Sequence, residues 1–248
     1  MTRQQSDAVA NFILANLSEA VYQRLEPHFY VSDLPLGEEL YRPMEPITKI
    51  YFPTTSLLSW VSLLEDGTLT EIALVGNTGV AGLSALWGGD YTPNSLLVQM
   101  AGKAVVADAA VAQQEFQRGG EFNQIISRYA QTLFVQMAQN VACNRHHTTE
   151  ERLARWLLSV QDGIQQNAKA LSKDIVLPIE LALTQEFMSK MLGVRRSSIS
   201  ISAGILQQAG MIRYRRGRLA ILDREQLEAT ACECYHLVKQ EYDRLRES

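Results

Sequence analysis

Hydrophobic positions change their spacing along the chain and divide it into three parts. From about Asp7 to His28, apolar residues recur mostly every three or four positions, which predicts a helix. From about Val31 to Val111, short apolar runs alternate with turn residues, a pattern typical of a β-sandwich or barrel. Helical spacing then returns and continues to a last helix expected from about Arg224 to Arg246.

Short strands are expected inside the all-β part. Asp66-Gly67 gives the strongest turn signal in the chain, because Asp-Gly favours the tight turns that join antiparallel strands. It lies between the second and third expected strands, which should therefore form a hairpin. The expected strands are Ile50–Phe52, Leu57–Leu64, Leu69–Val75, Leu96–Met100 and Ala104–Val106.

The stretch from Leu183 to Leu222 is interpreted as helix, tight turn, helix and β-hairpin. Thr184 is a suitable N-cap for the first helix, and Gly193 suits the turn because glycine tolerates positive φ. The second helix is expected from about Arg195 to Gln208, and Gly210 ends it. Two helices joined by a short turn that contains glycine form the helix-turn-helix unit.

The hairpin that follows has a basic tip. Met211–Tyr214 and Leu219–Leu222 are the expected strands, and Arg215-Arg216-Gly217-Arg218 joins them. This addition makes the unit a winged helix. The alternative is a surface helical hairpin with ordinary solvated arginines, but the turn, the helix phase, the hairpin and the charge all favour the winged helix.

The periodicity of the second helix leaves one face free. Ile199, Ala203 and Leu206 share one stripe and are expected in the core. The other side is small or polar, and two arginines stand at the N-terminus, the end that enters the major groove in helix-turn-helix proteins. The residues expected to contact DNA are Thr184, Arg195, Arg196, Ser197, Ser198, Ser200, Ile201, Arg213, Arg215, Arg216 and Arg218.

Charge supports this interpretation. Thr184 to Arg218 contains seven basic residues and one acidic residue, about +6 in a chain of 248 residues whose net charge is −4. A basic patch on an acidic protein is typical of phosphate binding. No apolar run approaches the ~18–20 residues that span a bilayer, so no membrane partner is expected.

A single long helix is expected from Phe122 to Asn144, a stretch without proline or glycine. Its apolar stripe either packs on the barrel of its own chain or forms a seam with the same helix of a second subunit. We favour the seam and a homodimer, because two subunits explain how one helix-turn-helix gains affinity for DNA. The stripe consists of Ile125, Ile126, Tyr129, Leu133, Met137 and Val141.

The sequence gives little support for a metal site, a cofactor site or an enzyme active site. Three cysteines, an odd number, favour a reducing cytoplasm. On a helix, Cys232 and Cys234 would point about 200° apart, and Cys143 lies in another region, so no metal site is expected. His146-His147 is expected to be an exposed hinge. The common phosphate-binding and hydrolase motifs are absent from the sequence, so neither an enzyme nor a cofactor is expected.

The order of these parts resembles the Crp/Fnr family of bacterial transcription regulators. Its most specific parts are Glu151–Leu158, Leu183–Ile212 and the Asp66-Gly67 hairpin. The resemblance implies an α+β protein with three parts. These are a cyclic-nucleotide-binding-like β jelly-roll over residues 1–120, a long dimerisation helix over 121–146 and a winged helix-turn-helix domain over 147–248. It also implies promoter DNA as a partner, with RNA polymerase and an unidentified small-molecule effector as further candidates.

One departure from the family concerns the ligand cassette of the barrel. Cyclic-nucleotide-binding members carry a Gly-Glu pair for the ribose and an arginine that neutralises the cyclic phosphate. Here Leu83 stands where the glutamate would be, and no arginine occurs between Arg42 and Arg118. We therefore expect no tight binding of cyclic AMP or GMP. The glycines still allow backbone N–H groups to bind another small anion. The degenerate cassette comprises Gly76, Gly79, Gly82 and Leu83.

A second departure concerns base recognition. Family members often read bases with an arginine, a glutamate and a second arginine. Arg196 matches the first of these, while Ser197 and Ile201 replace the other two. We expect Arg196 to contact a guanine and the wing arginines to contact phosphate. The sequence thus favours a DNA-binding transcription regulator. The alternative is a ligand-binding or interaction module whose winged helix contacts protein.

Overall fold

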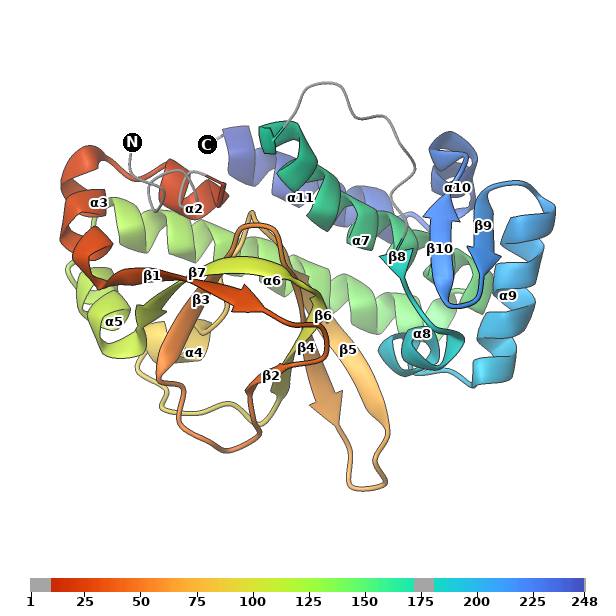
Figure 1. Cartoon of the computed structure of the whole chain (residues 1–248), viewed down its shortest axis with the longest axis horizontal. Coiled ribbons are helices and arrows are strands. Elements are labelled where there is room, and N and C mark those ends of the chain that lie inside the picture. Colours follow the sequence, from red (N-terminus) through yellow and green to blue (C-terminus); the bar gives the residue numbers. More distant parts are fainter. Residues whose placement is uncertain (1–9, 172–180, 248) are drawn as a thin grey trace.

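Two antiparallel sheets form the N-terminal part of the protein, which Figure 1 shows on the left. The computed structural model describes residues 10–171 and 181–247. One sheet has the strand order β1-β7-β3 and the other β2-β6-β4-β5. The strands are β1 (Phe29–Leu34), β2 (Glu39–Tyr41), β3 (Lys49–Pro53), β4 (Leu57–Leu63), β5 (Leu69–Val75), β6 (Ser95–Met100) and β7 (Gly102–Asp108). The expected strands are confirmed, and β1 and β2 are additional.

The predicted hairpin joins β4 to β5. Gly67 adopts a φ of 82°, and the Asp66 carboxylate accepts a hydrogen bond from the Thr68 N–H at 2.8 Å. The Leu64 N–H donates to the Thr68 carbonyl at 2.9 Å, which closes the turn. The Asp-Gly pair therefore supplies both the positive φ and the side-chain acceptor that this turn requires.

Short helices at the N-terminus replace the single helix predicted from Asp7 to His28. They are α2 (Phe12–Ala15), α3 (Glu19–Leu25) and the 3₁₀ turn η1 (Glu26–His28), while residues 7–9 lie outside the described ones. The prediction was wrong because Asn11 begins a separate helix. Its side chain accepts from the N–H groups of Ile13 and Leu14 and donates to the carbonyls of Pro53 and Gly79. The barrel thus fixes where this segment turns.

The predicted long helix is confirmed as α6 (Glu121–His146), which crosses the whole molecule (Figure 1). Before it, α4 (Leu83–Leu86) and α5 (Ala109–Gln117) cover one end of the sheets. Helix α7 (Thr149–Leu171) follows with a capping box. In this box the Glu151 carboxylate accepts from the Thr148 N–H at 2.8 Å, and the Thr148 hydroxyl accepts from the Glu151 N–H at 3.3 Å.

The C-terminal part contains the expected helix-turn-helix and hairpin. Its elements are β8 (Leu181–Ala182), α8 (Gln185–Leu192), α9 (Arg196–Gln208), β9 (Ile212–Arg215), β10 (Arg218–Ile221), α10 (Arg224–Thr230) and α11 (Cys234–Glu247). The sheet order β8-β10-β9 adds a third strand to the hairpin. The single final helix predicted from Arg224 to Arg246 is wrong, since the chain becomes extended at Ala231 (ψ 149°) and starts again as α11.

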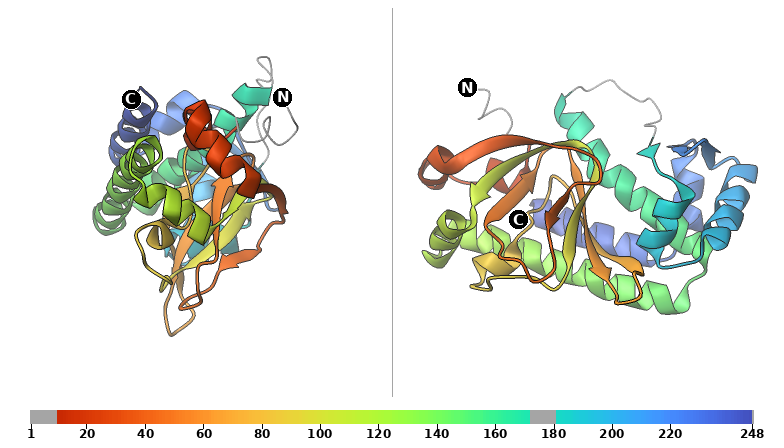
Figure 2. Two further views of the ribbon diagram at one scale, coloured as in Figure 1. Left: turned by 90° about the vertical axis from the view of Figure 1, so that its left-hand side faces the viewer. Right: turned by 60° about the horizontal axis from the view of Figure 1, so that its bottom comes forward.

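Helix α11 turns back and lies along α6, so the end of the chain returns to the barrel (Figures 1 and 2). The two parts of the protein share a core. Leu57, Val61 and Leu74 of the barrel pack with the buried residues of α7, α8 and α9. Within the described residues, no helix is long and apolar enough to cross a bilayer.

The stripe predicted as the subunit seam of α6 faces inward. Ile126 and Tyr129 are fully buried and Leu133 is 3% exposed, all in the barrel core of the same chain. Ile125 and Met137 are partly buried against that core. A side chain fully covered within its own chain cannot contact a partner, so the assignment of Ile126, Tyr129 and Leu133 to a seam is wrong. For the partly buried Ile125 and Met137 it stays a prediction. Of the predicted stripe, only Val141 is largely exposed, at 72%.

Candidate nucleic-acid interface

The first helix of the helix-turn-helix has a defined start and end. The Thr184 hydroxyl accepts a hydrogen bond from the Phe187 N–H at 3.1 Å, as expected of an N-cap. At the other end, Gly193 has a φ of 61°. Its N–H donates to the Lys190 carbonyl at 3.1 Å, and the Val194 N–H donates to the Ser189 carbonyl at 3.0 Å. This glycine-dependent end sets the sharp turn into α9.

Helix α9 buries the predicted face and exposes the opposite one. Ile199 and Leu206 are fully buried, and Ala203 is 2% exposed. Arg195 is the N-cap residue and Arg196 the first helical residue, so both lie at the N-terminal end of the helix. The exposed face carries Arg195, Arg196, Ser197, Ser200 and Ile201, while Ser198 is half-buried. Apart from Ser198, this is the arrangement predicted from periodicity.

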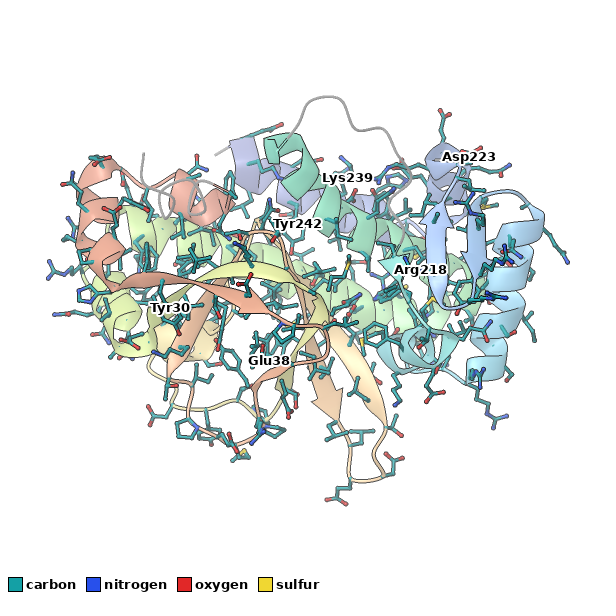
Figure 3. The ribbon with its side chains drawn as sticks, in the orientation of Figure 1. Tyr30, Glu38, Arg218, Asp223, Lys239 and Tyr242 are labelled. Atoms are coloured by element: carbon teal, nitrogen blue, oxygen red, sulfur yellow. The ribbon has the colours of Figure 1, made fainter. Side chains whose placement is uncertain are left out.

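The wing is a tight two-stranded ribbon. Arg215 pairs with Arg218, and Arg216 (φ 51°) and Gly217 (φ 75°) form the turn between them. Positive φ at both turn residues matches the right-handed twist of the strands. The Tyr214 N–H donates to the Gln207 side chain at 2.7 Å, which ties the wing to the end of α9. The wing arginines Arg213, Arg215, Arg216 and Arg218 are exposed, and Figure 3 labels Arg218.

A shallow hollow lies between helix α9 and the wing. Thr184 from the start of α8, Arg196 from the start of α9 and Arg216 from the wing line it together. Tyr214 adds an aromatic ring, and Glu186 adds one carboxylate. Residues that are distant in the sequence therefore meet on one surface with two guanidinium groups, an arrangement that suits a phosphate backbone.

The barrel contains a small apolar cavity of about 150 Å³ at the degenerate cassette. Leu83 lines it together with Gly82, Tyr41, Trp60 and Met137, and none of its described lining residues carries a charge. The volume lies below the ~300–1,000 Å³ typical of ligand pockets. Among the cassette glycines, Gly79 packs directly against the Tyr129 ring of α6, which occupies the space a side chain would need. A Cβ atom there would lie 2.4 Å from the Tyr129 ring.

A buried carboxylate links the barrel to α7, and no sequence pattern singled it out. The Trp156 indole N–H donates to Glu71 Oε1 at 2.8 Å, and Ser59 Oγ lies 2.7 Å from Glu71 Oε2. Burial raises the pKa of Glu71 from 4.5 to about 7, although these hydrogen bonds act in the opposite direction. Glu71 comes from β5 and Trp156 from α7, so this contact joins the two parts of the protein.

The cysteines, for which no metal site was expected, converge with a histidine. Cys143, His147, Cys232 and Cys234 place their ligand atoms within 4.8 Å of one another. The prediction assumed that Cys232 and Cys234 lie on one continuous helix, but Cys232 precedes α11 in an extended segment. His147 is not an exposed hinge either, since it turns inward while His146 stays exposed. The spacing in the sequence gave no sign of this cluster because it depends on the break between α10 and α11.

Comparisons with known proteins agree with this architecture. Residues 151–230 match the family model described as a Crp-like helix-turn-helix domain. No curated protein matches the chain. Among solved structures, FixK2 from Bradyrhizobium japonicum has a TM-score of 0.66 at 15% identity, covering 82% of this chain and 98% of that chain. A transcriptional regulator of the CRP family from Thermus thermophilus has a TM-score of 0.63 at 22% identity, covering 81% and 96%.

A further solved structure covers more of the chain. A transcriptional regulator of the Crp/Fnr family from Eubacterium rectale has a TM-score of 0.65 at 15% identity, over 89% of this chain and 98% of that chain. At such identities the likeness establishes the fold, and the family model establishes the domain. The chain therefore has the Crp/Fnr fold and carries a Crp-like helix-turn-helix domain over residues 151–230.

Proposed function

We propose that the protein is a homodimeric, sequence-specific DNA-binding regulator of transcription. The observation that carries this proposal is the shared hollow of Thr184, Arg196 and Arg216, which joins the exposed start of α9 to the basic wing. The division into a sensor-like barrel (1–120), a linking helix (121–146) and a DNA-binding part (147–248) follows the bounds of α6. RNA polymerase and a small-molecule effector are further candidate partners.

A protein-binding winged helix is the competing function. Four exposed arginines within the six residues from Arg213 to Arg218 favour DNA, because phosphate contacts need positive charge at the wing. Selection from a random DNA pool, followed by gel shifts, tests this directly. Recovery of a palindromic consensus supports the proposal, while a pool that stays random after several rounds contradicts it.

Arg196→Ala is expected to weaken specific DNA binding by ~1–3 kcal/mol and to relax the preference at one base pair of each half-site. The reason is that Arg196 is exposed at the N-terminal end of α9, where a bidentate contact to guanine is possible. Gel shifts with a set of single-base operator variants measure both effects. Unchanged affinity and unchanged base preference would remove Arg196 from the reading residues.

The double variant Arg215→Ala/Arg216→Ala is expected to act differently. It should weaken binding to all sequences alike and reduce the slope of log K against log salt concentration by ~2, about 0.9 for each lost phosphate contact. Arg42→Ala/Arg118→Ala is the matched control, because both are exposed arginines outside the winged helix that pair with carboxylates. A control variant with the same loss would show that net charge alone explains the effect.

The subunit seam that we propose lies on the outer face of α6. Phe134 and Val141 are 67% and 72% exposed, and Ala138 between them is exposed as well. Alternating steps of four and three residues place these side chains in one stripe, which is the pattern of a two-stranded helical seam. Parallel packing of two α6 helices would set the two recognition helices around a twofold axis, as operators with two half-sites require.

Cyclic AMP and cyclic GMP are expected not to bind in the micromolar range. A cyclic phosphate inside the apolar cavity would lack the charge-assisted partner that offsets its desolvation. Lys49, one of the two lysines between Arg42 and Arg118, pairs instead with Asp108 at 2.5 Å. Calorimetric titration of DNA-binding-competent protein with each nucleotide measures the dissociation constant. A micromolar dissociation constant for either nucleotide would contradict the prediction, and a small apolar effector fits the cavity better.

A further inference from the structure

Four side chains with metal-binding atoms meet where the linking helix ends. Cys143 lies in the last turn of α6, and His147 is the residue that ends this helix. Cys232 lies in the extended segment after α10, and Cys234 is the first residue of α11. All three cysteines of the chain therefore belong to one cluster. The cysteines are buried and His147 is partly buried.

Two of the distances between these atoms match the edges of a tetrahedral metal site, and all four atoms lie within 4.8 Å of one another. Cys143 Sγ and Cys232 Sγ are 3.5 Å apart, and Cys234 Sγ lies 3.7 Å from His147 Nδ1. With metal–sulfur bonds of ~2.3 Å and a metal–nitrogen bond of ~2.0 Å, a tetrahedral site has sulfur–nitrogen edges of about 3.5 Å and sulfur–sulfur edges of about 3.8 Å. Ligands of an iron–sulfur cluster would stand farther apart, because each binds a different iron atom.

The surroundings orient the histidine as metal sites require. His147 Nε2 lies 3.2 Å from the Glu233 carboxylate. Donation of the Nε2 proton to this carboxylate leaves the Nδ1 lone pair directed at Cys234, which is the tautomer that binds a metal. Metal-bound histidines in proteins nearly always have such an outer partner. Glu233 lies between two of the cysteines in sequence, so the same short segment supplies two ligands and this partner.

A positive charge lies against the sulfur atoms. The buried Arg155 of α7 brings its positive charge next to Cys143. Three thiolates and a divalent ion carry a net charge of −1, which one guanidinium group neutralises. Beside it, Arg152 donates to the Asn144 side chain at 2.8 Å and to the Leu192 carbonyl, so the same corner connects α6, α7 and the helix-turn-helix.

We propose that Cys143, His147, Cys232 and Cys234 bind one Zn²⁺ ion. The set of three thiolates and one imidazole fills all four positions of a tetrahedral site, which is the composition of a structural zinc site rather than a catalytic one. Binding displaces three thiol protons. The ion links the end of α6 to the start of α11, and so fixes the junction at which the DNA-binding part leaves the linking helix. This site is independent of the proposed function.

Metal content of the full-length protein tests the proposal. Untagged protein from zinc-supplemented medium is expected to hold about one zinc ion per chain by mass spectrometry of the metal. Replacement by Co²⁺ is expected to give the visible absorption of a tetrahedral thiolate site. Zinc-free protein in which non-reducing peptide mapping shows a Cys143–Cys232 disulfide would overturn the proposal, because that cross-link removes two of the four ligands.

Two neighbouring histidines provide a matched pair of variants. His147→Ala is expected to lose the zinc in a competition with a chelator and to change the Co²⁺ spectrum, while His146→Ala keeps both, since His146 is exposed and outside the cluster. Glu233→Gln is expected to weaken zinc affinity ~10–100-fold while retaining the fold by circular dichroism. If His147→Ala and Cys232→Ser bind zinc as tightly as the unchanged protein, the assignment is wrong.

Discussion

Replacing Phe134 by glutamate is expected to turn the proposed dimer into monomers and to weaken operator binding by about 100-fold or more. Burying a phenylalanine contributes ~1.5–3 kcal/mol, and a twofold seam loses this contribution from both subunits. The added carboxylates would also be desolvated next to each other. Together these effects correspond to ~1,000-fold in the dimer dissociation constant. Two linked helix-turn-helix units bind more tightly than one, so the loss of dimerisation lowers the affinity for DNA.

Sedimentation and gel shifts measure these two consequences separately. Val141→Glu is the second variant on the same stripe, needed because Phe134 also lines the barrel cavity. Leu64→Glu is the matched control, since Leu64 is 57% exposed near the turn of the β4–β5 hairpin. If both seam variants stay dimeric at micromolar concentration, the outer face of α6 is not the seam.

Stability is expected to decrease as the pH rises from about 4.5 to about 7, and Glu71 is the cause. Burial raises the pKa of this carboxyl group from 4.5 to about 7 in the folded protein. Between these values the folded protein keeps a proton that the unfolded chain has lost. The contribution to the free energy of unfolding is therefore complete below pH 4.5 and is lost as the pH passes 7. Its size is ~3 kcal/mol, from about 1.4 kcal/mol per pH unit.

Glu71→Gln is expected to remove this pH dependence and to be more stable than the unchanged protein at pH 8. The amide can still accept from Trp156 Nε1 and donate to Ser59 Oγ, which in turn lies 2.5 Å from Gln99 Oε1. Denaturant unfolding at pH 5, 6, 7 and 8 measures the effect. Glu38→Gln is the control, because Glu38 is an exposed carboxylate on the barrel (Figure 3). Equal pH dependence of both variants would remove Glu71 as the cause.

Local signals predicted the helix-turn-helix well. Thr184 caps α8, Gly193 permits the turn, and both are effects of a residue on its immediate neighbours. The face of α9 followed from periodicity, because the buried positions Ile199, Ala203 and Leu206 recur at helical spacing. The Asp66-Gly67 hairpin is another feature that the chain encodes within a few residues.

Contacts between segments that are distant in the sequence could not be predicted from local patterns. The stripe of Ile126, Tyr129 and Leu133 has the same spacing whether it packs on a barrel or on a second subunit, so periodicity could not distinguish the two. The link between Glu71 and Trp156 spans residues of different parts. Strand β1 lacks a regular alternation of buried and exposed residues, and its pairing with β7 defines it instead.

The sequence by itself determined the order of the three parts, helix α9 and the basic wing, because propensity, capping and charge act over a few residues. Only the tertiary structure decided which face of α6 stays free, and only it brought Cys143 and His147 to Cys232 and Cys234. Both depend on where the chain turns back at Ala231 and lays α11 along α6. Such a return is set by packing across the whole chain, and no local pattern records it.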